Sequence, residues 1–142
     1  REHLDSVDRV VRAASLYVLA ARRAGDAPQY RRALDDVDHR VRIEAVRALV
    51  SVDDVEGVVT AAGDENREVR IAAAAGLATL RSGADAVRGL VADTDPLVRA
   101  AALATLGQLG CGQDDYAAIK AALRAPAWRA GRRGARAGRR AG

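Results

Sequence analysis

Residues 36–49 read DVDHRVRIEAVRAL, and this stretch decides the fold because its frame recurs along the chain. A Val-Arg pair is followed by a small residue three positions after the arginine and by a leucine seven positions after it. The frame occurs four times, with its arginines at Arg12, Arg42, Arg70 and Arg99. These arginines are 30, 28 and 29 residues apart. Self-similarity at this period predicts a solenoid of stacked units rather than one globular core.

Each copy of the frame reads as an amphipathic helix with a polar cap. Four positions before the arginines stand Asp8, Asp38, Asn66 and Asp95. Their short side chains accept hydrogen bonds from the unpaired N–H groups of a first helical turn. From each cap, the valine, the small residue and the leucine are four positions apart, so they form one buried stripe. The helices are expected to end near Gly25, Ser51, Ser82-Gly83 and Gly110, with glycine supplying the left-handed residue.

A second, shorter helix fits each gap between the copies, roughly over 27–35, 53–62, 84–92 and 113–124. These segments begin near Asp or Pro residues, of which Asp26, Asp53-Asp54, Asp85 and Asp114-Asp115 are examples. Two helices per period and no alternating strand pattern predict an all-α fold. We therefore expect an α-solenoid of about four to five helix pairs in a right-handed superhelical array. The predicted repeats cover 5–35, 36–63, 64–92 and 93–124, within a solenoid over 1–125.

The frame Asp-x-[Asp/Asn]-x-x-Val-Arg-x-x-Ala-x-x-x-Leu resembles the short HEAT-like repeat of phycobilisome lyase proteins. Its first acid is filled by Asp36, Asp64 and Asp93, and by Ser6 in the first copy. This resemblance covers about residues 5–124 and implies helix pairs stacked into a curved sheet. It also implies a structural ladder in which the frame arginines meet aspartates of their own or the adjacent repeat. The ladder arginines are Arg12, Arg42, Arg70 and Arg99.

Residues 126–142 differ from the rest of the chain. Pro126-Ala-Trp-Arg129 resembles the opening of a further repeat, but no register of the following residues gives an apolar stripe. We expect an eroded fifth repeat followed by a disordered tail. All 19 acidic residues precede Tyr116, so residues 1–125 hold 17 basic and 19 acidic groups, and the high isoelectric point comes from the tail. The tail arginines are Arg129, Arg132, Arg133, Arg136, Arg139 and Arg140.

Composition excludes several classes of protein. The single cysteine, Cys111, cannot form an intramolecular disulfide or a cysteine-rich zinc site. No run of about 18 apolar residues predicts a membrane span, and we expect a cytoplasmic protein with no membrane partner. His3 and His39 lack a recurring acid–base partner, and the acidic clusters occur at helix starts, where the helix dipole favours them. The sequence therefore predicts no catalytic residue, no metal site and no cofactor.

The leading functional hypothesis is a non-enzymatic scaffold that binds another protein on the concave face lined by the second helices. The candidate partner-binding residues are Tyr30, Arg31, Asp54, Glu56, Arg88, Tyr116 and Lys120. The alternative is nucleic-acid binding, with the tail arginines contacting phosphates. A pigment-related role like that of bilin lyases finds no supporting residue.

The ends of the solenoid generate a separate expectation. The first helix offers Val7, Val10, Val11, Leu16 and Val18 as an apolar end face. Solenoid ends need polar caps to stay soluble. We therefore expect either self-association or that this chain is part of a longer protein.

Overall fold

The computed structural model describes residues 3–110 and 112–124, and within these ranges all regular structure is helical. The prediction of an all-α solenoid of stacked helix pairs is confirmed. Among the described residues, no helix has the length and apolar character needed to cross a membrane. The helices are α1 (Arg9–Ala21), α2 (Ala27–Ala33), α3 (His39–Ser51), α4 (Val55–Ala61), α5 (Arg67–Leu80), α6 (Ala84–Val91), α7 (Pro96–Leu109) and α8 (Gln113–Arg124).

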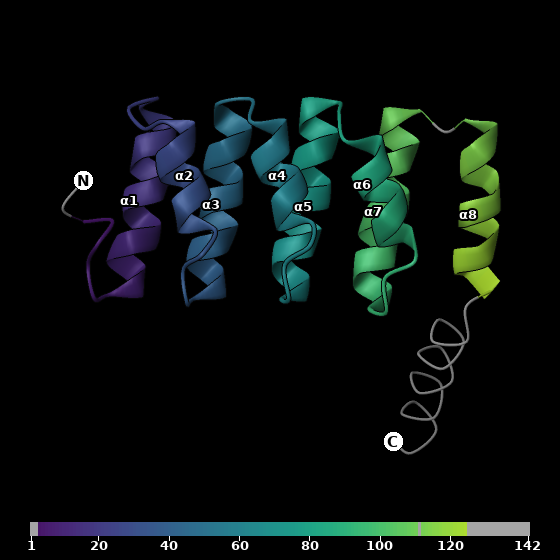
Figure 1. Cartoon of the computed structure of the whole chain (residues 1–142), viewed down its shortest axis with the longest axis horizontal. Coiled ribbons are helices and arrows are strands. Elements are labelled where there is room, and N and C mark those ends of the chain that lie inside the picture. The colour runs from purple at the N-terminus through teal and green to yellow at the C-terminus, as the bar shows by residue number, and fades with distance from the viewer. Residues whose placement is uncertain (1–2, 111, 125–142) are drawn as a thin grey trace, which may run out of the picture.

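The helices form a single row of pairs (Figure 1). The first helices α1, α3, α5 and α7 pack one against the next, and they form the continuous back of the row. The second helices cover one side of that back: α2 packs on α3, α4 on α3 and α5, and α6 on α5 and α7. Helix α8 departs from this pattern because its main contact is with α6. Each predicted repeat range contains one helix pair.

The predicted caps of the first helices are confirmed. Asp8, Asp38, Asn66 and Asp95 each accept a hydrogen bond from a backbone N–H in the first turn. Asp26 and Asp54 cap α2 and α4 in the same way, at 2.9 and 3.2 Å from the accepted nitrogen. Replacing one such cap by alanine costs about 1 kcal/mol.

Helix α6 starts without a capping side chain. Gly83 occupies the cap position with no side chain to accept a hydrogen bond, and Asp85 lies one residue inside the helix. Asp85 instead pairs with Arg88 one turn later, at 2.6 Å. The helix therefore begins near Asp85, as the sequence predicts, but Asp85 lies in its first turn and not at its cap.

The core is the predicted stripe of valine, small residue and leucine. In α3, Val41, Ala45 and Leu49 are at most 1% exposed, and the equivalent residues of α5 and α7 are buried to the same degree. The first copy differs, since Val11, Ser15 and Leu19 are only half-buried. The prediction that Leu16 lies on the exposed end face is wrong, because its side chain is fully buried. It points instead toward the core that α1 shares with α3.

The turns that follow the helices take the left-handed conformation mostly at residues other than glycine. Arg23, Asp53 and Arg81 have φ values of 50°, 56° and 50°, so non-glycine residues take the left-handed conformation there. Only Gly83 and Gly110 among the described glycines have positive φ. The prediction that Gly25 ends the first helix by accepting positive φ is therefore wrong.

Gly25 is needed for a close approach instead. A Cβ built at Gly25 would lie at most 2.7 Å from three atoms of the phenol group of Tyr30, which is fully buried. By contrast, a Cβ at Gly107, on the exposed side of α7, meets no atom within 4 Å.

We expect Gly25→Ala to lower the free energy of unfolding by about 1–3 kcal/mol, because the added methyl overpacks the core. The matched change Gly107→Ala should raise it by about 1 kcal/mol, since alanine favours a helix interior. Chemical denaturation followed by circular dichroism measures both. A Gly25→Ala protein as stable as the parent would show that the Tyr30 ring has room to shift.

Candidate functional site

The frame arginines connect neighbouring repeats through their loops. Arg12 donates from Nε and Nη2 to the two carboxylate oxygens of Asp36, at 2.8 and 2.9 Å. Arg42 makes the same pair of bonds to Asp64, at 2.9 and 3.2 Å, and Arg70 lies 2.9 Å from Asp93. The carboxylate thus always comes from the following repeat.

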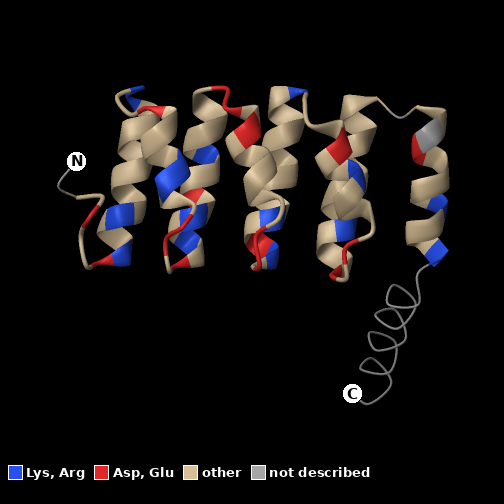
Figure 2. Cartoon of the chain, in the orientation of Figure 1, with Lys and Arg blue, Asp and Glu red and all other residues tan. Residues whose placement is uncertain are grey.

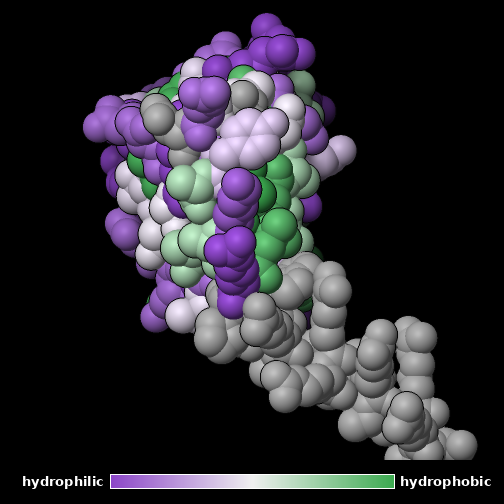
Figure 3. Space-filling model, turned by 90° about the vertical axis from the view of Figure 1, so that its right-hand side faces the viewer, coloured by the Kyte–Doolittle hydropathy of each residue, from purple (hydrophilic) through white to green (hydrophobic). Residues whose placement is uncertain are grey.

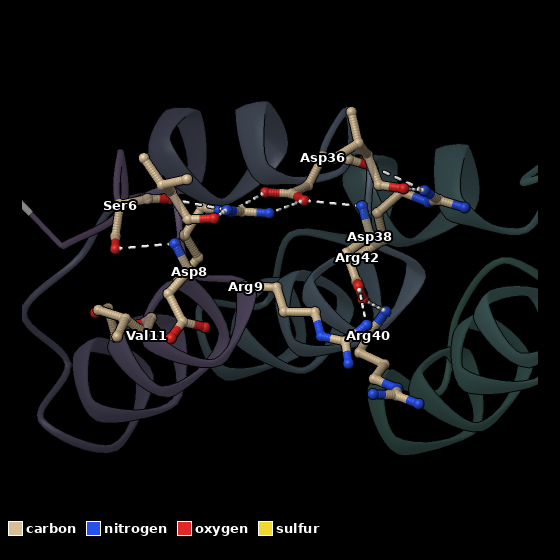
Figure 4. A network of polar contacts seen from close by, with 12 residues as sticks. Ser6, Asp8, Arg9, Val11, Asp36, Asp38, Arg40 and Arg42 are labelled. Carbon is tan, nitrogen blue, oxygen red and sulfur yellow. Dashed lines mark hydrogen bonds and ion pairs between the residues drawn. The ribbon is translucent and has the colours of Figure 1, made fainter.

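The same arginines also hold the loop that precedes their own helix. Nη1 of Arg12 donates to the carbonyl oxygens of Ser6 and Val7, at 2.7 and 3.0 Å. Arg42, Arg70 and Arg99 bind the carbonyls six and five residues before them in the same manner. The guanidinium groups of Arg12, Arg42 and Arg70 therefore join the backbone of one loop to the carboxylate of the next, as Figure 4 shows around Asp36.

The ladder aspartates also accept a backbone hydrogen bond within their own loops. Asp36 accepts the backbone N–H of Asp38 at 2.9 Å, and Asp64 and Asp93 do the same for Asn66 and Asp95. In the first loop Ser6 takes this place, with its hydroxyl oxygen 3.2 Å from the nitrogen of Asp8. One carboxylate thereby shapes the turn that presents the next helix cap.

Electrostatics and burial give the ladder a structural role. The side chains of Arg12, Arg42, Asp36 and Asp64 are only 10–14% exposed. Burial raises the pKa of Asp36, but the hydrogen bonds from Arg12 and from the N–H of Asp38 together hold that pKa below its usual range. Buried pairs of this kind fix geometry and are costly to break. A partner has little access to them.

A second row of contacts, which sequence reasoning missed, runs beside the ladder. Arg9 lies 3.2 Å from Asp38 and Arg67 lies 3.4 Å from Asp95, both across a repeat junction. At the junction between them, Nε2 of His39 lies 3.6 Å from Glu68, so His39 has a partner that the sequence did not suggest. The signal was present, because Arg9, His39 and Arg67 all directly follow a helix cap.

The second helices carry ion pairs of their own. Arg31 of α2 donates to both carboxylate oxygens of Asp54 at the start of α4, and lies 3.3 Å from Glu56. The hydrogen bond to Asp54 raises the pKa of Arg31 above its usual value. Arg88 of α6 reaches Asp115 of α8, whose side chain is 2% exposed.

The junction between α4 and α6 lacks such a pair. Counted from the helix caps, the place of Arg31 and Arg88 is taken in α4 by Val59, and the cap of α6 is Gly83 rather than an acid. Among the described ion pairs, none joins α4 to α6.

Most of the predicted partner-binding residues are accessible on the face of the second helices. The side chains of Arg31 and Arg88 are 44% and 41% exposed, and that of Glu56 is 82% exposed. Tyr116 is 60% exposed and Lys120 is exposed, both in α8. Figure 2 shows the charged residues of this face, and Figure 3 shows apolar side chains on the α8 end of the row.

Two of the predicted partner-binding residues, Tyr30 and Asp54, are not accessible to a partner. Tyr30 is fully buried, because its ring fills the core beneath Gly25, and this burial raises the pKa of its hydroxyl. Tyr30 therefore cannot contact a partner in this conformation, and its placement on the binding face is corrected. The side chain of Asp54 is 9% exposed and is occupied by Arg31.

A cavity of about 600 Å³ opens between α1, α2 and α3. Leu16 and Val41 are apolar members of its lining, and the paired Arg12 and Asp36 form part of its wall. Neither this pair nor any other lining residue belongs to the buried polar groups without a hydrogen bond in the described chain. The cavity therefore shows no buried polar group that requires a ligand among the described residues.

Other predicted features lie outside the described residues. They are Cys111 and the tail arginines Arg129, Arg132, Arg133, Arg136, Arg139 and Arg140. Within residues 3–110 and 112–124, no group of three or more His, Cys, Asp or Glu side chains is placed to hold a metal ion.

Comparison with known proteins identifies the repeats. A family model described as HEAT repeats matches residues 55–138. The chain belongs to the HEAT repeat family. HEAT repeats are typically non-catalytic and generally mediate protein binding. The finer resemblance to the repeats of phycobilisome lyases stays a prediction.

A crystal structure of an engineered protein from the Northeast Structural Genomics Consortium is similar to this HEAT repeat chain, with a TM-score of 0.56 and 23% identity. The similarity covers 85% of this chain and 65% of the engineered protein, so the chain spans less than two thirds of that protein's length. At this identity the likeness shows the fold alone. No curated protein matches.

We expect Arg42→Met to lower the free energy of unfolding by about 3 kcal/mol, because it leaves the carboxylate of Asp64 buried without its partner. The control Arg67→Met removes an arginine that is 55% exposed and also bridges two repeats. It should cost less than about 1 kcal/mol, as exposed pairs do. Chemical denaturation compares the two, and equal losses would contradict a special role for the inner ladder.

Proposed function

We propose that this chain is a non-enzymatic scaffold that binds another protein on the face formed by α2, α4, α6 and α8. Membership of the HEAT repeat family supports an interaction role. The observation that carries the choice of face is the row of exposed charged and aromatic side chains along these helices. They are Arg31, Glu56, Arg88, Tyr116 and Lys120.

Two features suit this face to binding. Arg31 and Arg88 are each held by a carboxylate of the next second helix, so their guanidinium groups are oriented before a partner arrives. Such preorganisation reduces the entropy lost on binding. Tyr116 supplies an exposed aromatic ring, and tyrosine and arginine are the side chains that most often dominate interface energies.

The charges of this face favour a partner segment that carries both signs. Glu56 is acidic, Lys120 is basic, and the two arginines retain exposed edges beside their carboxylates. A partner segment of one sign would be attracted by some of these side chains and repelled by others.

The triple variant Glu56→Lys, Tyr116→Ala, Lys120→Glu should abolish partner capture, because it reverses two charges and removes the aromatic anchor. These side chains are exposed, so helicity by circular dichroism should not change. The measurement is affinity capture from extract of the source cells, with captured proteins identified by mass spectrometry.

The matched control is Glu68→Lys with Leu97→Ala, which alters exposed side chains of the first helices. A protein captured by the parent and the control but lost with the triple variant supports the proposed face. Capture that survives the triple variant would place the binding surface elsewhere.

Nucleic-acid binding through the tail is the second candidate function. Its support is the run of six arginines without an acid after Pro126. On the solenoid, arginines such as Arg12, Arg31 and Arg42 are already paired with carboxylates, which leaves the tail as the stronger source of phosphate contacts.

If the tail binds phosphates, changing its six arginines to glutamine in the full chain should remove binding to generic duplex DNA and single-stranded RNA. Fluorescence anisotropy at low and moderate salt measures this, and the parent's binding should weaken steeply as salt rises. A control with the exposed solenoid residues Arg22, Arg32 and Arg40 changed to glutamine should bind as the parent does. No binding by the parent protein would end this alternative.

A further inference from the structure

The outward face of α1 is apolar along its whole length. Val10 and Tyr17 are each 65% exposed, Val18 is 45% exposed, and Ala14 and Ala21 are also exposed. Their spacing places them on one side of the helix, opposite the buried Leu16. Exposed apolar patches of this kind mark interaction surfaces in soluble proteins.

This face carries larger apolar side chains in α1 than the same face does in α3. When α3 is aligned with α1 by its cap, Arg40, Glu44 and Arg47 take the places of Val10, Ala14 and Tyr17, and Ser51 takes the place of Ala21. Helix α3 is thus polar at these four places, whereas α7 has Leu97, Ala101 and Ala104 at the equivalents of Val10, Ala14 and Tyr17. The packing of the repeat therefore does not require these apolar residues.

A groove of about 290 Å³ runs between α1 and α3 beside this face. Val10, Ala14 and Tyr17 line it from α1, and Arg40 and Glu44 are among the residues that line it from α3. The carboxylate of Glu44 uses Oε1 to pair with Arg47, whereas its Oε2 is buried and accepts no hydrogen bond within the described structure. An occupant with a hydrogen-bond donor would satisfy that oxygen.

We propose that the occupant is a second copy of this chain, with the two α1 helices antiparallel about a twofold axis at Ala14. Val10 and Val18 lie four residues to either side of Ala14, so each Val10 meets Val18 of the second copy. The small side chain of Ala14 allows the helices to approach closely at the axis. A twofold interface needs this kind of self-complementary surface.

Tyr17 fits the groove of the other copy in this arrangement. In an antiparallel pair, Tyr17 of the second copy crosses the axis to the N-terminal side of Ala14. Helical side chains lean toward the N-terminus of their own helix. The ring of Tyr17 in the second copy therefore lies beside Ala14 of the first copy, when measured along the axis of α1. Glu44 occupies the position equivalent to Ala14 in the parallel helix α3, so the Tyr17 hydroxyl can donate to its Oε2.

Another repeat stacked against α1 would be a poorer occupant. The three ladder junctions each use an aspartate of the following loop, but the first loop has Ser6 in that place. Moreover, the α3 positions equivalent to Val10 and Tyr17 are Arg40 and Arg47, which stay exposed although α1 stacks on α3. Stacking would therefore leave Val10 and Tyr17 uncovered.

Sedimentation velocity of the full chain over increasing concentration tests the proposal. The expected mass rises from one chain toward two in the micromolar range, since one helix face makes a small interface. Tyr17→Glu should keep the protein at the mass of one chain with unchanged helicity. Tyr17→Phe should weaken association by about tenfold or less, because it removes only the hydrogen bond.

The control Leu97→Glu places the same charge at an exposed apolar residue of α7 and should associate as the parent does. Crosslinking tests the axis directly. In a Cys111→Ser background, Ala14→Cys should form a disulfide-linked dimer under mild oxidant, whereas Gln108→Cys on α7 should not. A parent of constant one-chain mass, or association that survives Tyr17→Glu, would overturn the proposal.

Discussion

At the repeat junctions made by Arg12, Arg42 and Arg70, the fold depends on one guanidinium group that is bound on two sides. Its Nη1 holds the carbonyls of the loop before its own helix, and its other nitrogens hold the aspartate of the next loop, as with Arg42 between Asp36 and Asp64. The planar, five-donor geometry of arginine makes this possible, and lysine could not replace it. Since each aspartate also shapes the turn before a helix cap, one side chain coordinates loop conformation, helix start and repeat spacing.

Much of the solenoid could be predicted because its determinants are local and periodic. Caps such as Asp38 and Asp95 are recognisable from residue type, and the stripe of Val41, Ala45 and Leu49 follows from helical spacing. The ladder members were also visible, yet the spacing could not decide whether an arginine reaches its own or the adjacent repeat. That choice depends on how far apart the loops lie after the helices have packed.

The candidate face was predictable only in part, because burial of a side chain depends on the neighbouring turn. Tyr30 has the spacing of a surface residue on a short helix, but the absence of a side chain at Gly25 opens a space that the ring fills. Likewise, Leu16 and Val18 of the first helix are both apolar, and only the direction of α3 decides which is buried. The sequence shows which residues are apolar, whereas packing determines which of them remain available to a partner.

The two linked pairs of second helices have a mechanical consequence for the array. Arg31 ties α2 to α4 and Arg88 ties α6 to α8, whereas Val59 and Gly83 leave the α4–α6 junction without such a tie among the described residues. In a solenoid each repeat contacts only its neighbours, so a change of curvature is distributed according to the stiffness of each junction. The array is therefore expected to flex as two stiff halves that hinge between the second and third helix pairs, opening or closing the face around whatever lies along it.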